Sequence, residues 1–541
     1  MIFTKNFIRK LTAVLILCVL LFCGCTPKED EPIIMPGNSN NQNNSSTEAL
    51  QGGVLRIPMN ASPATMHPLF VKQMQMRNVF SMIFEPLIEF NDLSEPSACI
   101  AESWKYDTSR SVWLFQVRTN VHWHSDLGEI TGADAAWTIN TILANPDSIY
   151  YSDVSKYVLR AEASGNTLIV YPKINSYALL YALNIPVLPQ RYYEGKPANT
   201  LDVPRGSGCF CVDSLTFTNT KMELSAFSKW WKKLPNISKV VATGYADSES
   251  MLEAFKAGEL DCAPSSLKTT GNYELLTGVN AQNYLDRDYV FLGYNTKQAY
   301  VSSTTFRKAI AYAINKTKII NNVYLTKASG AEQPLFNDTS LSSASNTKYD
   351  YNISKAKELL AQLGYKDNNG DGYLESGSTT IELTTVVIST PSNPVRLEAV
   401  EYIKNDLEKV GIKMKVFALS EAALKDVVKS GSYHLVLSGY YLSDTPNLHF
   451  VFDANGEGNF SKYSSADMNS ALASVDKAAN LEELKTSVHS IQKILSRDLP
   501  QLGLFFEMNT LLYRENLTVA NIHRESNVYA KINTWYFTSF E

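Results

Sequence analysis

A loop late in the chain carries the side chains best suited to holding a small molecule. It spans residues 440–446, with the sequence YYLSDTP. Tyr440 and Tyr441 offer flat stacking surface at little loss of rotamer entropy, and the Asp444 carboxylate suits a ligand ammonium or a row of sugar hydroxyls. A plain surface turn that begins at Asp444, ahead of Thr445 and Pro446, accounts for the same residues. The residues alone leave both interpretations open.

The elements before this loop place it at one edge of a predicted sheet. Apolar runs and helical periodicities alternate as strand, helix, strand, helix and strand, at 381–389, 396–410, 412–418, 421–429 and 433–439. This order predicts a doubly wound α/β lobe with right-handed crossovers. Ligands of such lobes bind beyond the carboxyl ends of the strands, and the loop follows the third strand directly.

Two other stretches predict strands joined to helices. A strand at 289–295 is followed by a helix that repeats apolar residues at i, i+3, i+4, i+7 and i+8 from Phe306, with Ser302 and Ser303 as candidate caps. Upstream, strand 240–243, helix 249–257 and strand 259–263 form a strand-helix-strand unit. This unit predicts another piece of parallel sheet with helical cover.

Two groups of residues raise the question of a metal. His122 and His124 face one side of a predicted short strand, but no third zinc ligand stands at a recognisable spacing, so we interpret them as flanking Trp123 in a hairpin. Residues 367–372 (DNNGDG) match the start of a calcium loop. Position twelve is Ser378, where such a loop needs a glutamate, which favours a tight polar turn. We expect no metal and no cofactor, and calcium binding by Asp367 to Asp371 stays open.

Catalytic motifs are missing from the sequence. There is no nucleophile elbow, no HExxH and no Walker loop. Glu401 and Asp406 are paired acids, but both lie on the predicted amphipathic helix 396–410 and are best explained as its solvated face. We expect no enzyme activity.

Length and charge narrow the classes of protein further. A chain of 541 residues is too long for one hydrophobic core, so two or three domains are expected. Its formal net charge of -5 argues against a nucleic-acid partner, which usually requires a basic face.

The N-terminus has the pattern of a secretory signal. Lys5, Arg9 and Lys10 precede an apolar run at 11–22, and Gly24-Cys25 follows at once. This resembles a bacterial lipoprotein signal, residues 1–24, after which Cys25 becomes the lipidated mature N-terminus; plain secretion is the alternative. Residues 25–52 are rich in Asn, Ser, Pro and Gly, and we expect a flexible tether.

Four cysteines lie beyond the tether: Cys99, Cys209, Cys211 and Cys262. Cys209 and Cys211 would share one face of a strand, where they are poorly placed to bond each other, and their CxC spacing lacks a second pair for zinc. A bridge from one of them to Cys262 is compatible with an oxidising compartment, but buried free thiols are favoured.

A series of short motifs follows one order along the mature chain. They stand at 53–56, 60–68, 83–87, 101–104, 121–134, 206–208, 258–261, 294–296, 306–310 and 356–365. In this order they resemble the extracellular solute-binding proteins of the peptide and nickel class that serve ABC importers.

This resemblance implies an α/β fold of two lobes that close on a ligand, with an inserted subdomain. Lobe I would comprise 53–90, 189–288 and 508–541, the insertion 91–188, and lobe II 289–507. Tyr294 and Asn295 would lie in the hinge. Asp444 stands where the family commonly carries an aspartate for a peptide's N-terminal ammonium. Gly439, Tyr440, Tyr441 and Ser443 would be its neighbours in the ligand site.

The resemblance therefore implies a lipid-anchored substrate-binding component of an ABC importer, with an oligopeptide as the expected ligand. Its partners would be permease subunits and, through the lipidated Cys25, a membrane; a monomer outside the cytoplasm is expected. A receptor of the same fold for a sugar, a metal chelate or a signalling peptide is the alternative, since 29 tyrosines and 7 tryptophans suit sugar stacking too. A secreted hydrolase is the alternative from another class.

Overall fold

The computed structural model describes residues 49–218, 220–266, 270–336, 339–343, 347–388, 394–522 and 528–540. They belong to one compact unit, Ala49–Glu541. The predicted signal, Cys25 and most of the predicted tether lie outside the described residues. Within the described ranges, no helix is long and apolar enough to cross a membrane.

The first sheet has four strands in the order β1-β10-β9-β8. Their bounds are β1 Val54–Asn60, β10 Lys239–Tyr245, β9 Lys221–Ala226 and β8 Phe210–Thr216. β1 runs parallel to β10, and the other pairs are antiparallel. Leu55, Ile57 and Met59 alternate along β1 and are all buried, so this strand contributes one face to the core. Helix α2 (Met74–Ile83) packs against β1 and β8.

A second sheet forms within residues 101–172, in the antiparallel order β4-β5-β7-β6. Its strands are β4 Ala101–Asp107, β5 Val112–Val117, β7 Thr167–Pro172 and β6 Val158–Ser164. Helix α3 (Gly132–Ala144) packs on β6 and β7. The whole sheet falls inside the stretch predicted to be an insertion, whose limits stay a prediction.

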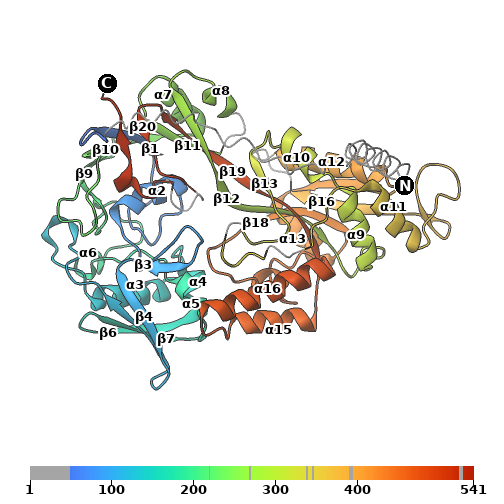
Figure 1. Cartoon of the computed structure of the whole chain (residues 1–541), viewed down its shortest axis with the longest axis horizontal. Helices are drawn as coiled ribbons and strands as arrows, with labels where there is room; N and C mark the ends of the chain where they lie inside the picture. The colour runs from blue at the N-terminus through green and yellow to red at the C-terminus, as the bar shows by residue number, and fades with distance from the viewer. Residues whose placement is uncertain are drawn as a thin grey trace, which may run out of the picture. The chain divides into compact units, whose positions relative to one another are not determined.

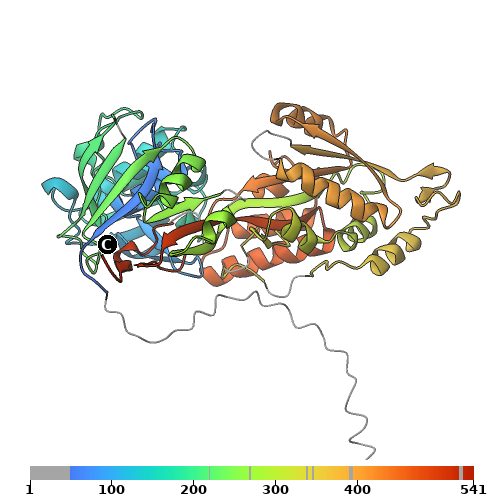
Figure 2. The ribbon, with the colours of Figure 1, turned by 90° about the horizontal axis from the view of Figure 1, so that it is seen from above.

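The largest sheet has seven strands, in the order β11-β19-β12-β18-β16-β17 with β13 paired to β19. Their bounds are β11 Cys262–Ser265, β19 Gln501–Arg514, β12 Val279–Tyr294, β18 Leu435–Tyr441, β16 Glu382–Ile388, β17 Lys413–Leu419 and β13 Ala328–Gly330. β12 and β19 pair antiparallel over nearly their whole lengths. Figure 2 shows the green β12 and the red β19 running side by side.

The predicted alternation of strands and helices before the candidate loop is confirmed. β16 is parallel to both β17 and β18, and helices α12 (Val395–Glu408) and α13 (Glu421–Ser430) connect them. The helix predicted from Phe306 is α9 (Thr304–Ala313), and the Ser303 hydroxyl accepts from the Phe306 N–H at its start. Figure 1 shows α9 beside α11 (Ile353–Gln362), its packing partner.

The remaining elements are short, apart from α15 and α16. The helices are η1 His124–Asp126, α4 Tyr151–Tyr157, α5 Leu179–Ala182, α6 Gln190–Tyr193, α7 Ser248–Lys256, α8 Gly271–Glu274, α10 Lys316–Asn322, α14 His449–Phe452, α15 Ala466–Val475, α16 Leu481–Asp498 and η4 Ile532–Thr534. The strands are β2 Ile88–Phe90, β3 Pro96–Ala98, β14 Glu375–Ser376, β15 Thr379–Thr380, β20 Leu517–Thr518 and β21 Tyr536–Phe537.

Two sequence predictions of local structure are wrong. The strands on either side of α7 do not share a parallel sheet: β10 lies in the first sheet, while β11 is antiparallel to β19 in the largest one. The Asp261 carboxylate, bonded to the Arg56 backbone N–H and side chain, fixes the chain at the start of β11. The short strand predicted to carry His122 and His124 is replaced by an isolated bridge from His122 to Glu129 and the turn η1.

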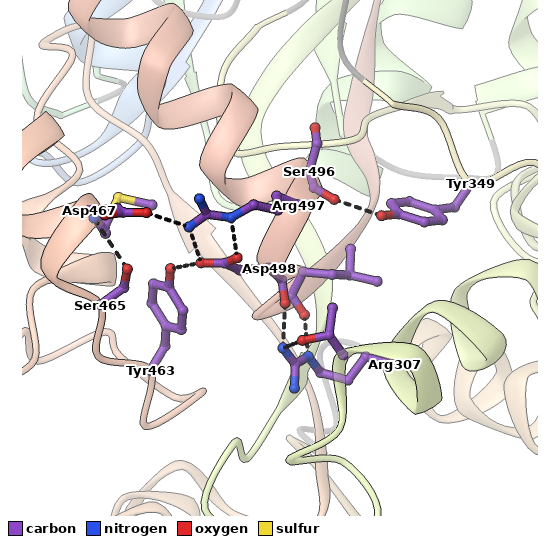
Figure 3. A network of polar contacts seen from close by, with 11 residues as sticks. Arg307, Tyr349, Tyr463, Ser465, Asp467, Ser496, Arg497 and Asp498 are labelled. Carbon is purple, nitrogen blue, oxygen red and sulfur yellow. Dashed lines mark hydrogen bonds and ion pairs between the residues drawn. The ribbon is translucent and has the colours of Figure 1, made fainter. Parts of the chain in front are cut away.

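The buried Arg307 side chain joins two helices that are distant in sequence. Its guanidinium donates to the Thr304 hydroxyl and to the carbonyls of Val301, Ser302, Asp498 and Leu499. The last two carbonyls lie at the C-terminal end of α16, where intrahelical donors run out. The Asp498 carboxylate is held separately by Arg497 and Tyr463, as Figure 3 shows. Arg307 thus ties the start of α9 to the junction between α16 and β19.

Replacing Arg307 with Met should lower the free energy of unfolding by about 3 kcal/mol, because several buried carbonyls lose a charged donor. Arg497→Met is the matched control. That side chain is about half exposed, so water screens its ion pairs and they should contribute little to stability. Urea unfolding followed by circular dichroism measures both; equal losses would contradict the role assigned to Arg307.

Glu85 is a buried acid near the first sheet, only 6% exposed. Trp231 Nε1 donates to its Oε2 at 2.6 Å, and the Lys232 ammonium lies 3.7 Å from its Oε1. Burial raises the pKa of Glu85 from 4.5 to about 7, although Lys232 and the Trp231 hydrogen bond pull it down. The folded protein therefore favours the protonated acid.

Glu85→Gln should flatten the pH dependence of stability between about 4.5 and 7. Because the folded pKa lies above the unfolded value, the native state binds more protons in this window, so its free energy of unfolding falls as pH rises. The wild type should lose about 3 kcal/mol relative to the Gln variant across the window. Urea unfolding at several pH values on both sides of the window measures this difference, and parallel curves for the two proteins would contradict it.

Candidate ligand-binding site

The loop predicted to bind a ligand emerges at the carboxyl end of β18, as expected. It borders a small cavity of about 50 Å³. The cavity is lined by Ser94 and Tyr181, by Pro334, Leu335, Phe336, Thr339 and Leu341, and by residues 442–448 with Phe450. Four segments that are far apart in sequence therefore meet there, with apolar walls and a few polar groups, which is the usual composition of a small-molecule site.

Asp444 forms an ion pair with Arg287 at the edge of this cavity. The Arg287 side chain is 8% exposed and the Asp444 side chain 23% exposed. Arg287 lies in β12, and its carbonyl accepts from the Leu442 N–H at 3.0 Å, which fixes the start of the loop. The pair engages Oδ2 of Asp444; its Oδ1 makes no hydrogen bond to the described part of the chain. Asp444 therefore lines the cavity, and only one of its two carboxylate oxygens is engaged by Arg287.

A second acid reaches the loop from helix α4. The Thr445 hydroxyl lies 3.1 Å from Asp153 Oδ1 and 2.6 Å from the Ser443 hydroxyl. Burial raises the pKa of Asp153, and the nearby Asp444 carboxylate raises it further. Sequence reasoning missed both Asp153 and Arg287, because neither stands in a local motif.

The predicted site residues divide into two groups. Ser443 and Asp444 line the cavity. Tyr440 is only 7% exposed, stacks on Phe291 with ring centroids 4.4 Å apart and donates to the Gly458 carbonyl at 2.6 Å. Tyr441 is 51% exposed and, like Tyr440 and Gly439, is not among the residues lining the cavity. Ligand contacts by these three residues stay predictions.

Close packing explains why a glycine stands at position 439. A Cβ there would stand 2.7 Å from Arg396 Nη2 and 3.0 Å from the Tyr289 carbonyl. The absence of a side chain therefore lets the Arg396 guanidinium and β12 approach β18 closely.

Tyr294 and Asn295, the predicted hinge residues, lie at the end of β12. The Asn295 side chain donates to the carbonyls of Gly431 and Tyr433, each at 3.0 Å, and its backbone N–H donates to the His434 carbonyl. The two register irregularities of the β12–β19 pair lie earlier, between Leu285 and Tyr289 and between Val290 and Phe291. The hinge role of Tyr294 and Asn295 stays a prediction.

The two histidines that raised the metal question occupy different environments. Both ring nitrogens of His124 are bonded to backbone: Nε2 donates to the Gly208 carbonyl at 2.9 Å, and Nδ1 accepts from the Gly206 N–H. Burial lowers the pKa of His124 to about 4, so the ring is neutral. His122 lies 3.9 Å from the Glu129 carboxylate at the surface. His124 therefore acts as a structural link and has no nitrogen left for a metal.

The four described cysteines are free thiols, as favoured from the sequence, and Cys99, Cys209 and Cys262 are buried.

The interpretation of Asp406 as part of a solvated face is wrong. Its side chain is buried because the start of α10 covers it: Oδ2 accepts from the Asn315 N–H at 2.9 Å and Oδ1 from Lys409 at 2.6 Å.

The chain matches a known protein family and is similar to several characterised proteins. Residues 95–462 match the model of the bacterial extracellular solute-binding proteins, family 5. The oligopeptide-binding protein AppA of Bacillus subtilis is 21% identical over 506 residues, covering 90% of this chain and 92% of AppA. The nickel-binding periplasmic protein of Escherichia coli is 21% identical over 391 residues, covering 70% of this chain and 73% of that protein.

Among solved structures, the chain is similar to the unliganded open form of the periplasmic murein tripeptide-binding protein MppA. The TM-score is 0.77 at 17% identity, covering 90% of this chain and 98% of MppA. The similarity confirms the predicted two-lobe α/β fold.

Proposed function

Because this chain belongs to the bacterial extracellular solute-binding proteins of family 5, we propose that it is the substrate-binding component of an ABC importer. It would capture an oligopeptide between two lobes and deliver it to a membrane permease. The observation that carries the ligand assignment is the Asp444 carboxylate at the cavity wall, held by Arg287 through one oxygen and open to a ligand through the other. Such an oxygen suits a peptide's N-terminal ammonium.

The names of two relatives favour a peptide over other solutes. AppA is an oligopeptide-binding protein and MppA a murein tripeptide-binding protein. The cavity adds apolar side chains, Phe336, Leu442 and Phe450 among them, that suit the side chains of a peptide.

The lobes would have the limits proposed from the sequence: 53–90, 189–288 and 508–541 for lobe I, 91–188 for the inserted subdomain, and 289–507 for lobe II. Polar contacts join the proposed insertion to the proposed lobe II, from Thr445 to Asp153 and from Lys156 to Asn447 beside the cavity loop, and from Ser176 to the Val475 carbonyl. A ligand that contacts both sides would favour the closed form, and a permease would recognise that form. The proposed hinge is at Tyr294 and Asn295.

The proposal extends to location and partners. The protein would act outside the cytoplasm as a monomer without enzyme activity, anchored by a lipid on Cys25 and docking on permease subunits. The signal pattern at residues 1–24 and the tether-like composition of 25–52 support the anchor. The net charge of -5 supports the exclusion of nucleic acid as a partner.

Asp444→Asn should weaken binding of a free-amine peptide about 10- to 100-fold, because a charged hydrogen bond contributes about 1.5–3 kcal/mol. Thermal-shift screening of the purified mature protein against peptide, oligosaccharide and metal-chelate collections first supplies the probe, since a ligand at a hundredfold excess over Kd stabilises by about 2.7 kcal/mol. Titration calorimetry then compares the best peptide with its N-acetylated form.

Asp453→Asn is the control for this experiment, because Asp453 follows helix α14 outside the cavity lining. Equal weakening of the free and acetylated peptides would reject the ammonium role. Binding of only a sugar or a metal chelate would reject the peptide assignment and keep the binding-protein class. Chemical turnover of any ligand in the same samples would contradict the proposal that the protein is not an enzyme.

Cys25→Ser should release the protein from the membrane when it is expressed in a bacterium, because the thiol that would carry the lipid is lost. Immunoblots of membrane and soluble fractions measure the change, with Cys211→Ser as the control for loss of a thiol elsewhere. A Cys25→Ser protein retained in the membrane fraction to the wild-type extent would contradict lipid anchoring.

A further inference from the structure

Three acidic residues converge in the segment between α11 and β16, far along the chain from the loop of Asp444. They are Asp367, Asp371 and Glu375, and one carboxylate oxygen from each lies within 4.8 Å of the others. Asp367 and Asp371 are exposed, whereas Glu375 is only 4% exposed. The cluster therefore has an open side toward solvent and a floor formed by one buried acid.

The buried acid is incompletely satisfied. Glu375 Oε2 accepts from the Asn368 N–H at 2.7 Å, but Oε1 is buried and has no hydrogen-bond partner among the described residues. A carboxylate oxygen removed from water without a donor or a cation carries a large desolvation penalty, so buried acids are normally paired or coordinate a metal. Two further carboxylates at this place increase the need for positive charge.

Local pairing holds Glu375 in place. Its backbone N–H donates to the Lys366 carbonyl at 2.8 Å, and β14, in which it lies, pairs with β15. The preceding Leu374 N–H donates to the Gly411 carbonyl between α12 and β17. The hairpin thus folds Glu375 back onto the loop that begins at Asp367.

This arrangement changes the interpretation of the sequence motif. The motif lacks a glutamate at position twelve, where Ser378 stands, and on that ground a metal-free turn is predicted. The structure brings in a glutamate from position nine instead. Glu375 supplies the third carboxylate that the sequence pattern, counted to position twelve, does not show.

We propose that Asp367, Asp371 and Glu375 bind a calcium ion. Oxygen-only ligands suit a hard cation, whereas zinc prefers nitrogen and sulfur. Ca²⁺–O bonds of about 2.3–2.6 Å place opposite ligands about 4.6–5.2 Å apart, which is compatible with three carboxylate oxygens that all lie within 4.8 Å of one another. Mg²⁺ demands near-ideal octahedral geometry and keeps several waters, so an all-carboxylate set on one turn favours the geometrically more tolerant Ca²⁺.

The ion would act on the part of the protein that carries β16 and β17. The segment from Asp367 to Glu375 is tied through Leu374 to the turn before β17, and the Ile381 N–H, just ahead of β16, donates to the Leu374 carbonyl. Calcium would therefore fasten this segment to one edge of the largest sheet. Its effect would be on stability, and the site is separate from the cavity at Asp444.

Titration calorimetry of the EDTA-treated, dialysed mature chain with CaCl₂ tests the proposal. One site is expected, with a Kd of about 0.1–1 mM, the range of extracellular calcium modules, and at least about tenfold weaker binding of MgCl₂. Glu375→Gln and Asp371→Asn should each raise the Kd for Ca²⁺ at least about tenfold, because each removes one charged ligand. Asp426→Asn removes an exposed carboxylate on α13 and should bind Ca²⁺ like the wild type.

Three results would overturn the proposal: no binding of Ca²⁺ up to about 10 mM, unchanged affinity in the Glu375 and Asp371 variants, or equal affinity for Mg²⁺. If Glu375→Gln fails to fold, the exposed Asp371→Asn and Asp367→Asn variants decide the question. Circular dichroism of each variant distinguishes loss of a ligand from loss of structure.

Discussion

The antiparallel pairing of β12 with β19 is the interaction on which the rest of the structure depends. It runs from Val279 opposite Arg514 to Gly293 opposite Gln501. A sixteen-residue strand such as β12 spans about 50 Å, which is long enough to pair with strands in both halves of the largest sheet. At one end β19 also pairs with β11, and at the other β12 pairs with β18, which continues the sheet to β16 and β17. The backbone hydrogen bonds of two strands therefore hold both halves of the largest sheet.

The candidate site follows from the register of this sheet. β12 and β18 are neighbours, with Asp288 opposite Tyr441. Arg287, one residue before Asp288, therefore lies beside Leu442 and meets the loop that leaves β18. A slip of one residue would turn the Arg287 side chain to the other face of the sheet and separate it from Asp444. The position of the carboxylate thus depends on the pairing of strands whose residues are 157 positions apart.

Periodic patterns in the sequence predict individual helices and strands well. They do not predict sheet membership or burial where these depend on segments that are distant in sequence. Helix α9 and the succession from β16 to β18 have strong periodicities of their own, so their existence and order could be predicted. The sheet membership of β11 depends on β19, some 250 residues later, and no pattern near Cys262 indicates it. The pattern of α12 alone predicts a solvent-exposed Asp406, because it does not indicate that the start of α10 covers this side chain. Asp153 was missed for the same reason, since 292 residues separate it from Thr445.

Four acids of this protein, three of them buried and Asp444 partly exposed, differ in what compensates their charge. Asp406 is satisfied by a backbone N–H and a lysine, which is sufficient for a structural link. Glu85 has a tryptophan donor and a lysine at 3.7 Å, and its pKa rises so that a proton completes the compensation. Asp444 has a guanidinium on one oxygen and lines the cavity, an arrangement compatible with the proposed contact to a cationic ligand group. Glu375 has a backbone donor on one oxygen, nothing on the other and two carboxylates nearby, so among these four acids it is the one whose surroundings call for a metal ion.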